Sequence, residues 1–521
     1  MATMRERVAE LERLRAAARE MGGAAKVEKQ HSRGKLSARE RLDRFFDGGQ
    51  YFEIGIHGTQ MGHGSDKDKP AADAVVCAWG KVGGRYTAVA AYDFTVKGGS
   101  IGQVGEVKVS RMRELSLRCR MPFVWFIDSA GARIDPKSTQ SGDTLSLFAG
   151  AGALFREEVV MSGVVPLVSA MVGPGAAGTA YIPGLADFVP MTKDKSSMAL
   201  GGPPLVKAAT GQVVTEQDLG GSKVHNTKSG VGDMEVPDDD ACIQAVKDYL
   251  SYMPQHCGER PPIVECTDPV DRRDEALLDL LPENTRSFYD MYDLIKVIVD
   301  DGKFLDIKSK WARSLITCFA RFGGRPVGIV ANNPKQLGGI LTADAADKAA
   351  HFIEICDAFN IPLVFLMDVP GFMIGSQVEH QGIIRHGAKM LHAMAAATVP
   401  KLTVVTRRGY GAGYFVMAGR GFEPDLIVAW PGAEISVMGA SGMVGIAAPK
   451  LFGNVEPPPE VRQQIVDTIQ KNIDIYKVAG WGLIDDVIDP CDTRTVLCQA
   501  IEMSWNRVIE RPPRKRGVMP V

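Results

Sequence analysis

The chain repeats part of itself at a fixed distance, and this duplication constrains its fold more than any other feature of its 521 residues. Residues 85–91 correspond to residues 325–331 at an offset of 240 (325 − 85). The same offset joins Gly131 to Gly371 and residues 122–128 to residues 362–368. A period this long indicates one copied domain, because solenoid repeats are only about 20–50 residues long. We therefore expect two domains of one fold, each with its own pocket.

The stretch over residues 258–289 is the poorest in core-forming residues and has a linker-like composition rich in Pro and charge. A chain of this length also exceeds what one hydrophobic core supports. We predict a first domain over residues 1–265 and a second over residues 280–521.

Short β-branched runs with glycine breaks alternate with longer helical stretches in both halves. Near-continuous apolar strands separated by helices predict α/β domains with mostly parallel sheets buried on both faces. The Ser37 and Glu40 spacing predicts a capped helix start, and residues 4–30 read as one amphipathic helix. The clearest strands are predicted at 86–91, 123–127, 167–172, 327–331, 363–367 and 402–406.

Composition excludes several classes of protein. The net charge of −2 gives no electrostatic reason to expect a nucleic acid or an anionic membrane as partner. The chain has no run of about 18 uncharged apolar residues. Its nine cysteines lie singly, without a C-x-x-C pair, so we predict neither a zinc ribbon nor disulfides. With no secretory apolar segment near residue 1, the expected location is the cytoplasm.

In each half, one predicted strand ends in a glycine-rich turn that starts a helix, at residues 168–181 and 404–415. Small residues let a ligand approach the main chain, and the first N–H groups of a helix lack partners. Such N–H groups can form an oxyanion hole. A single turn of this kind more often serves packing, but two at matching positions favour two binding sites.

The sequence lacks the usual catalytic side-chain motifs. It contains no G-x-S-x-G elbow, no H-E-x-x-H, no Walker lysine loop and no G-x-G-x-x-G fingerprint followed by an acid. His31, His225 and His386 have no partner at a spacing that predicts a triad or a metal site. Oxyanion holes without an obvious acid or base suggest that a cofactor carries the proton chemistry.

Several ordered motifs then point to one family. They resemble the carboxyltransferase (β) subunits of biotin-dependent acyl-CoA carboxylases, in the propionyl-CoA and methylcrotonyl-CoA carboxylase group. The resemblance extends from His31 to about Arg494. The motifs are DFTVKGG at 93–99, DSAGAR at 128–133, GGPPLVKAATG at 201–211, LGGSKVH at 219–225, DVPGF at 368–372, GIIRHGAK at 382–389 and EISVMG at 434–439.

The resemblance implies a tandem duplication of two crotonase-like (ClpP/crotonase ββα superhelix) domains, and a homo-oligomer that is usually a hexamer. In this family the N-terminal half binds the acyl-CoA and the C-terminal half binds biotin. By motif position, the amides of Ala177 and Gly178 would hold the thioester oxygen. The amides of Ala412 and Gly413 would hold the ureido oxygen of biotin.

The matched motifs also imply a substrate-binding set and no metal. These residues are Lys97, Gly98, Gly99, Ser129, Gly131, Ala132, Arg133, Phe372 and Phe415. The implied reaction releases CO2 from carboxybiotin, removes the α-proton of the acyl-CoA with the ureido anion, and carboxylates the resulting enolate. The chain has no Met-Lys-Met biotinyl hairpin and no ATP-grasp loop, so a partner would supply the biotin carboxylase and biotin carboxyl carrier.

Three departures from the family pattern leave the acyl substrate open. Ala177 occupies a position that is usually Gly, and Ser129-Ala130-Gly131 replaces the usual Ser-Gly-Gly. Phe415 lies where propionyl-CoA enzymes tend to carry Asp. Other motifs lean to either branch of the group.

Three other readings compete with this one. The first is the same subunit acting in a biotin-dependent acyl-CoA decarboxylase with a membrane partner. The second is a biotin-independent crotonase-type hydratase, isomerase or hydrolase, which needs a carboxylate near the hole. Neither turn has one within a few residues. The third is a CoA-binding scaffold, which two intact holes disfavour.

Overall fold

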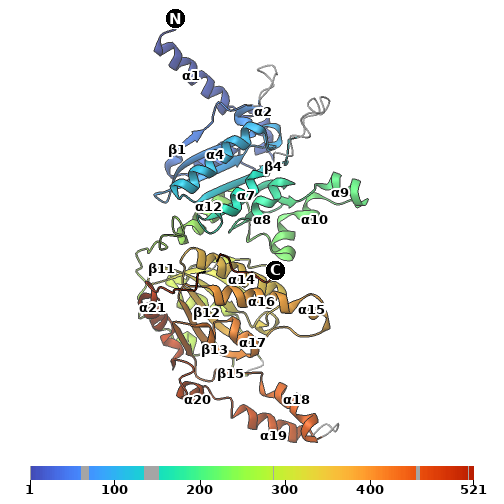
Figure 1. Cartoon of the computed structure of the whole chain (residues 1–521), viewed down its shortest axis with the longest axis vertical. Helices are drawn as coiled ribbons and strands as arrows, with labels where there is room; N and C mark the ends of the chain where they lie inside the picture. Colours follow the sequence, from blue (N-terminus) through green and yellow to red (C-terminus); the bar gives the residue numbers. More distant parts are fainter. Residues whose placement is uncertain (1, 60–69, 134–151, 285–286, 453–457, 514) are drawn as a thin grey trace. The chain divides into compact units, whose positions relative to one another are not determined.

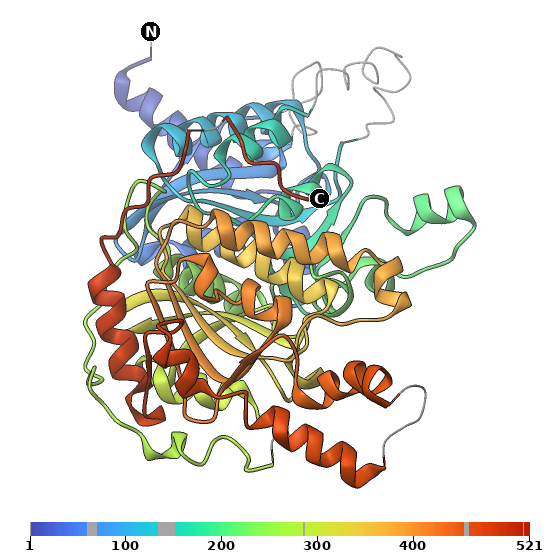
Figure 2. The ribbon, with the colours of Figure 1, turned by 60° about the horizontal axis from the view of Figure 1, so that its bottom comes forward.

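The computed structural model describes residues 2–59, 70–133, 152–284, 287–452, 458–513 and 515–521 (Figure 1). The chain forms two compact units, Met1–Glu259 and Arg260–Val521. Each unit is an α/β domain built on its own sheet (Figures 1 and 2). Within the described residues, no helix is long and apolar enough to cross a membrane.

The first unit contains an eight-stranded sheet with the order β1-β2-β3-β4-β5-β6-β8, in which β7 also pairs with β5. Strands β1 to β3 are antiparallel, and the later pairs are parallel. The strands are β1 (Tyr51–Ile54), β2 (Val75–Val82), β3 (Arg85–Tyr92), β4 (Phe123–Ser129), β5 (Leu167–Ala176), β6 (Pro190–Thr192), β7 (Ser197–Ala199) and β8 (Met234–Val236).

The second unit repeats this sheet strand for strand, with the order β9-β10-β11-β12-β13-β14-β16 and β15 paired with β13. The strand directions repeat as well. The strands are β9 (Phe304–Ile307), β10 (Leu315–Phe322), β11 (Arg325–Asn332), β12 (Leu363–Val369), β13 (Lys401–Tyr410), β14 (Leu426–Ala429), β15 (Glu434–Ser436) and β16 (Asp486–Val487).

Helices cover both sheets, and Figure 1 shows α4 across the first sheet and α14 beside α16 across the second. The first unit has α1 (Met4–Arg19), α2 (Ala24–His31), α3 (Ala38–Phe45), α4 (Gln103–Cys119), α7 (Ala153–Met161), α8 (Gly178–Gly184), α9 (Pro203–Thr210), α10 (Glu216–Gly220), α11 (Ser222–Val224) and α12 (Asp239–Tyr252). The second has α13 (Met291–Ile298), α14 (Ala343–Ala358), α15 (Ser376–His380), α16 (Ile383–Ala396), α17 (Gly411–Val416), α18 (Ala440–Phe452), α19 (Pro459–Gln470), α20 (Ile475–Gly480) and α21 (Thr493–Ser504).

Both faces of the central strands are buried, as the apolar runs predict. On β4, successive side chains point to opposite faces of the sheet. Trp125 joins the core cluster that includes Met112 of α4. The next residue, Phe126, packs against Phe45 of α3 with ring centroids 5.5 Å apart. The burial of both faces fixes the register of the strand, because a slip of one residue would move every side chain to the opposite face of the sheet.

The predicted single helix over residues 4–30 is wrong, because the chain breaks into α1 and α2. A Cβ on Gly22 would lie 2.1 Å from the carbonyl oxygen of Thr95, and Gly23 has a φ of 90°. The glycine pair therefore lets the chain turn against the β3 end. The Ser37 capping box predicted for α3 is confirmed.

The duplication begins earlier than the sequence comparison indicated. Asp47 accepts hydrogen bonds from the N–H groups of Gly83 and Gly84, at 3.0 and 2.9 Å. Asp300 caps the equivalent turn, Gly323 and Gly324, at 2.9 and 2.7 Å. Asp47 and Asp300 are 253 residues apart (300 − 47), and α3 matches α13 at that same offset.

Candidate functional site

The turn between β5 and α8 is the first predicted oxyanion hole. Ala177 links the two elements with φ 52° and ψ −120°, a region that favours glycine. Its N–H donates to the carbonyl oxygen of Ala199 on β7, at 3.1 Å. Gly178 is the first residue of α8, where N–H groups have no acceptor within the helix. Gly178 therefore offers its amide, whereas the amide of Ala177 is already engaged.

The turn between β13 and α17 is the second predicted hole. β13 ends at Tyr410 and β5 at Ala176, an offset of 234 residues (410 − 176). Gly411, with a φ of 54°, then occupies the place of Ala177. Ala412 occupies the place of Gly178. The two predicted pairs are therefore shifted by one residue relative to each other. Of the residues in the pairs Ala177 with Gly178 and Ala412 with Gly413, only Gly178 and Ala412 occupy equivalent positions.

Glycines at the ends of β4 and β12 lie beside these turns. A Cβ on Gly131 would lie 2.7 Å from the carbonyl oxygen of Ala176. A Cβ on Gly413 would lie 3.2 Å from Cα of Gly371 and 2.7 Å from Cγ2 of Val369. The structure therefore brings each predicted hole together with the strand-end glycine that the duplication singled out.

The predicted substrate-binding loop of the first unit lies along the end of β4. Lys97, Gly98 and Gly99 have φ values of 50°, 64° and 64°. The N–H of Ala130 donates to the Gly98 carbonyl at 2.9 Å. A Cβ on Gly99 would lie 2.1 Å from the carbonyl oxygen of Asp128. Only glycine fits there, so the loop and the strand end form one backbone surface.

Ser129 and Arg133 make internal contacts. The buried Ser129 hydroxyl accepts the N–H of Gly131 at 3.1 Å. The Arg133 guanidinium pairs with Asp73 and donates to the Ser100 hydroxyl at 3.1 Å. Ala132, in contrast, is exposed. Arg133 therefore fastens the loop over residues 97–101, and its charge is compensated by Asp73.

Asp73 is a site residue that the sequence did not reveal. It lies in a left-handed turn, with φ values of 51°, 49° and 64° at Ala72, Asp73 and Ala74. Such backbone is strained in non-glycine residues and needs support from its surroundings. Buried Lys108 gives that support by donating to the carbonyl oxygens of Ala72 and Val75, at 2.8 and 2.6 Å. Periodicity carries no signal for this turn.

Asp128, at the end of β4, is fully buried and surrounded by positive charge. Its carboxylate binds Lys35 at 2.7 Å and Arg41 at 3.2 Å, and accepts the Gln30 amide at 2.7 Å. A Cβ on Gly173 would lie 1.9 Å from Asp128 Oδ1. Burial lowers the pKa of Lys35, and the Asp128 carboxylate acts against that change. Gly173 in the glycine-rich turn thus makes room for this network.

Asp368 holds the same position on β12 and is also fully buried. Arg407 Nε lies 2.9 Å from its carboxylate, and Arg408 Nε lies 2.6 Å from it. The two arginines occupy the places of Gly173 and Pro174 at the offset of 234. Both halves therefore fix the strand beside the hole with a buried carboxylate, but with cations from different parts of the chain.

The two predicted phenylalanines lie in the second unit. The ring of Phe372 is half-buried and would lie 3.1 Å from a Cβ on Gly387 of α16. Phe415 lies on α17 and is 49% exposed. Its ring centroid is 6.1 Å from that of Tyr414 and 6.3 Å from that of Phe422. Phe415 is the equivalent of Tyr181 on α8 at the offset of 234.

Comparison with known proteins identifies the family. Residues 29–519 match the carboxyl transferase domain. The chain belongs to this family. It is 43% identical to the methylmalonyl-CoA carboxyltransferase 12S subunit of Propionibacterium freudenreichii subsp. shermanii, covering 99% of this chain and 98% of the relative. It is 39% identical to the methylmalonyl-CoA decarboxylase subunit alpha of Veillonella parvula, covering 100% of both.

The human mitochondrial propionyl-CoA carboxylase beta chain is 39% identical, covering 96% of this chain and 91% of the relative. A crystal structure of the transcarboxylase 12S hexamer with methylmalonyl-CoA bound matches with a TM-score of 0.93 and 42% identity, over 100% of both chains. As in these carboxyltransferases, the fold is a tandem pair of crotonase-like domains.

The three histidines singled out in the sequence of this carboxyl transferase family member, His31, His225 and His386, do have partners, which sequence spacing did not indicate. His225 donates from Nε2 to the Met198 carbonyl at 2.8 Å, since a carbonyl can only accept. Its Nδ1 lies 2.7 Å from the Ser229 hydroxyl. Met198 precedes Ala199 on β7, so His225 supports the strand that contacts the first turn. Among the described residues, no group of three His, Cys, Asp or Glu could hold a metal.

His386 and His31 have carboxylate partners. His386 Nδ1 lies 2.8 Å from Asp347 on α14, and Lys389 Nζ lies 3.0 Å from the same carboxylate. His31 Nε2 lies 3.0 Å from Glu40. These contacts join neighbouring helices, so they were found only once the fold was known.

Proposed function

We propose that the chain is the carboxyltransferase subunit of a biotin-dependent acyl-CoA carboxylase. It would move a carboxyl group from carboxybiotin, carried on a partner subunit, to a short-chain acyl-CoA. The observation that carries this proposal is the recurrence of one turn at Gly178 and Ala412 in equivalent places of two copied domains. Full-length relatives named for propionyl-CoA and methylmalonyl-CoA support the substrate class.

The first unit is proposed to hold the acyl-CoA thioester. The amide of Gly178 would donate to the thioester oxygen and stabilise the enolate that forms when the α-proton leaves. Each such donor contributes about 3 kcal/mol in a site that excludes water. The predicted second donor is the N–H of Ala177. It would have to break its hydrogen bond to the Ala199 carbonyl before it could donate to the substrate.

The second unit is proposed to hold biotin. Its turn is built from small residues, because Gly411 has a φ of 54° and a Cβ on Gly413 would lie 2.7 Å from Val369. Carboxybiotin, when bound, supplies the CO2 unit and a base for the α-proton. The amides of Ala412 and Gly413 would hold the ureido oxygen and favour its negative charge.

The buried carboxylates argue against a hydratase or isomerase. Those reactions need a side-chain acid or base beside the hole. Asp128 and Asp368 lie closest along the chain to the glycines that flank the turns, but both are fully buried and paired with cations. They position the strands and are unsuited to proton transfer.

A biotin-dependent acyl-CoA decarboxylase is a second candidate. The subunit from Veillonella parvula matches over the full length of both chains, and the same turns would serve the reverse reaction. The two functions differ in their partners, not in this chain.

The family and its relatives also support a homo-oligomer, and we propose the hexamer of the 12S relative. The proposed location is the cytoplasm, consistent with nine free cysteines.

The test of function is carboxylation of a panel of acyl-CoAs from acetyl to geranyl. The full chain is mixed with a biotinylated partner subunit, ATP and labelled bicarbonate. We expect label in short-chain products only when biotin is present. No label with any acyl-CoA, despite an active biotin carboxylase, would contradict the proposal.

A further inference from the structure

An aromatic pair lies directly beside Gly178. A Cβ on Gly178 would lie 3.5 Å from Cζ of Phe155, in ordinary van der Waals contact. Phe155 packs edge-to-face on Tyr181, with ring centroids 5.6 Å apart and an interplanar angle of 77°. Tyr181 follows Gly178 by three residues on α8, so the two share a helix face. Both rings therefore lie near Gly178, the residue whose amide is proposed to bind the thioester.

The pair is not part of a closed core. Tyr181 is 52% exposed, and Phe155 is half-buried at the edge of a core cluster. Two partly open rings next to an available amide form an apolar surface that can contact a hydrocarbon chain.

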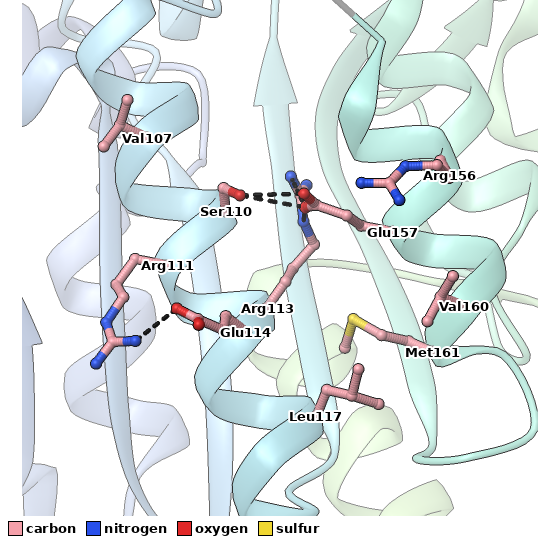
Figure 3. A pocket seen from close by; sticks show the side chains of 10 residues that line it. All are labelled: Val107, Ser110, Arg111, Arg113, Glu114, Leu117, Arg156, Glu157, Val160 and Met161. Atoms are coloured by element: carbon pink, nitrogen blue, oxygen red, sulfur yellow. Dashed lines mark hydrogen bonds and ion pairs between the residues drawn. The ribbon is translucent and has the colours of Figure 1, made fainter.

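The helix that carries Phe155 is firmly held. Figure 3 shows Glu157 of α7 between two side chains of α4. Its carboxylate lies 3.1 Å from Ser110 Oγ and 2.6 Å from the buried Arg113. The neighbouring Glu158 accepts the indole N–H of Trp125 at 3.0 Å. These contacts bind α7 to α4 and to the sheet, so the helix that carries Phe155 is anchored on both.

The cavity in Figure 3 has a volume of about 530 Å³, and Phe155 is not among the residues that line it. Ser110, Arg113 and Glu157 in its lining join α4 to α7, whereas Arg111 pairs with Glu114 within α4. It is lined by Val107, Ser110, Arg111, Arg113, Glu114, Leu117, Arg156, Glu157, Val160 and Met161.

Ala177, the residue before Gly178, is also closely packed. The methyl group of Ala177 would lie 3.5 Å from a Cβ on Gly131. Gly178 thus follows a residue with a methyl side chain, Ala177, and its Cα faces the ring of Phe155.

We propose that Phe155 and Tyr181 form the wall of the acyl-chain site and set the longest chain that the enzyme accepts. Short acyl thioesters fit, and longer ones meet the Phe155 ring. The proposal rests on the function above, in which the Gly178 amide binds the thioester. A methylene that gains or loses its place in an apolar site changes specificity by about 10–200-fold.

The test uses the full chain and acyl-CoA thioesters from acetyl to octanoyl. Dissociation constants are measured by calorimetry without the biotin partner, for wild type, Phe155→Ala, Phe155→Leu and Tyr181→Ala. We expect the affinity ratio of hexanoyl-CoA to propionyl-CoA to rise at least tenfold in Phe155→Ala and less in Tyr181→Ala. Tyr181 is half exposed, so its variant tests the wall even if Phe155→Ala fails to fold.

Phe52→Ala is the matched control, because Phe52 is an exposed ring stacked on Trp79 with centroids 5.4 Å apart. Its ratio should equal that of wild type. If the affinity ratio of hexanoyl-CoA to propionyl-CoA in the Phe155 and Tyr181 variants stays within twofold of wild type, these residues do not limit the acyl chain. The variants could change the affinity ratio while the chain carboxylates no acyl-CoA. That result would support the role of Phe155 and Tyr181 in binding the acyl chain and would contradict the proposed function.

Discussion

The two halves fix equivalent buried aspartates by different means. In the first unit, Lys35 and Arg41 reach Asp128 from a segment before the sheet, more than 80 residues away in sequence. In the second, Arg407 and Arg408 lie on β13 and reach Asp368 from the adjacent strand. Duplication therefore kept the carboxylate and the strand geometry, while the compensating charges changed.

This difference makes the first unit dependent on its N-terminal segment. Arg41 is fully buried and also binds Asp239 at 2.8 Å. Its counterpart in α13 is Leu294, at the offset of 253. The second unit needs no such residue, because its arginines come with the strand.

Arg41→Leu gives the first unit the residue of the second and should have the largest effect. It leaves Asp128 and Asp239 buried with less compensation, at a cost of about 3–5 kcal/mol in the free energy of unfolding. Arg44→Ala on the same helix removes an exposed pair with Asp240 and should cost about 1 kcal/mol or less. Chemical denaturation measures both. Equal losses would show that the buried network is not what supports the first unit.

Glu158 makes the first unit sensitive to pH. Burial raises the pKa of Glu158 to about 7 from 4.5, with Arg113 and Trp125 acting against the change. The folded state therefore holds its proton longer, so stability falls as the pH rises from about 4.5 to about 7, by roughly 3 kcal/mol in total. In Glu158→Gln this fall should shrink, as followed by denaturation at several pH values. A slope identical to wild type would refute the assignment.

Asp187 is buried and its pKa is likewise raised to about 7 by burial, so part of the slope should persist in Glu158→Gln. Adding Asp187→Asn to Glu158→Gln and repeating the denaturation at several pH values measures how much of the remaining slope comes from Asp187. The second unit has Asp425 at the equivalent position, with a pKa that burial also raises.

The strands that support the turns also differ between the halves. β7 is held by His225 through Met198, whereas β15 is held by Glu434, which binds the Tyr410 hydroxyl and, at 2.6 Å, the Gln470 amide. His225→Ala should lower kcat about tenfold with little change in KM, because the Gly178 donor moves out of line with the enolate oxygen while the other contacts of the acyl-CoA stay. His225→Gln can still donate to Met198 and should recover most of the rate. A rise in KM alone would point to direct substrate contact instead.

Ala177 and Gly411 offer a small but matched comparison. Both have φ above 50°, and only Gly411 adopts it without strain. Left-handed backbone costs a non-glycine residue about 1–2 kcal/mol, partly offset by the entropy that glycine loses on folding. Ala177→Gly should therefore stabilise the protein by about 0.5–1 kcal/mol. Gly411→Ala should destabilise it, since its Cβ would also lie 3.1 Å from the Val437 carbonyl.

Much of the fold could be predicted because the duplication, the apolar strands and the capping box are local or periodic signals. The engaged amide of Ala177 could not, because its acceptor, Ala199, is on another strand. The pairs Asp73 with Arg133 and His386 with Asp347 also join distant segments. The site motifs indicated which residues gather at the turns, but the side-chain partners depend on three-dimensional packing.

Equivalent backbone amides are proposed to serve the two halves of one reaction, and substitutions at Ala412 probe this proposal. Ala412→Pro removes the N–H at the start of α17, where proline suits the helical backbone, and Ala412→Gly retains it. Biotin-dependent carboxylation and acyl-CoA binding are measured for both. We expect a loss of about 100–1000-fold in rate for the proline variant alone, with unchanged acyl-CoA affinity. Equal rates in the two variants would contradict it.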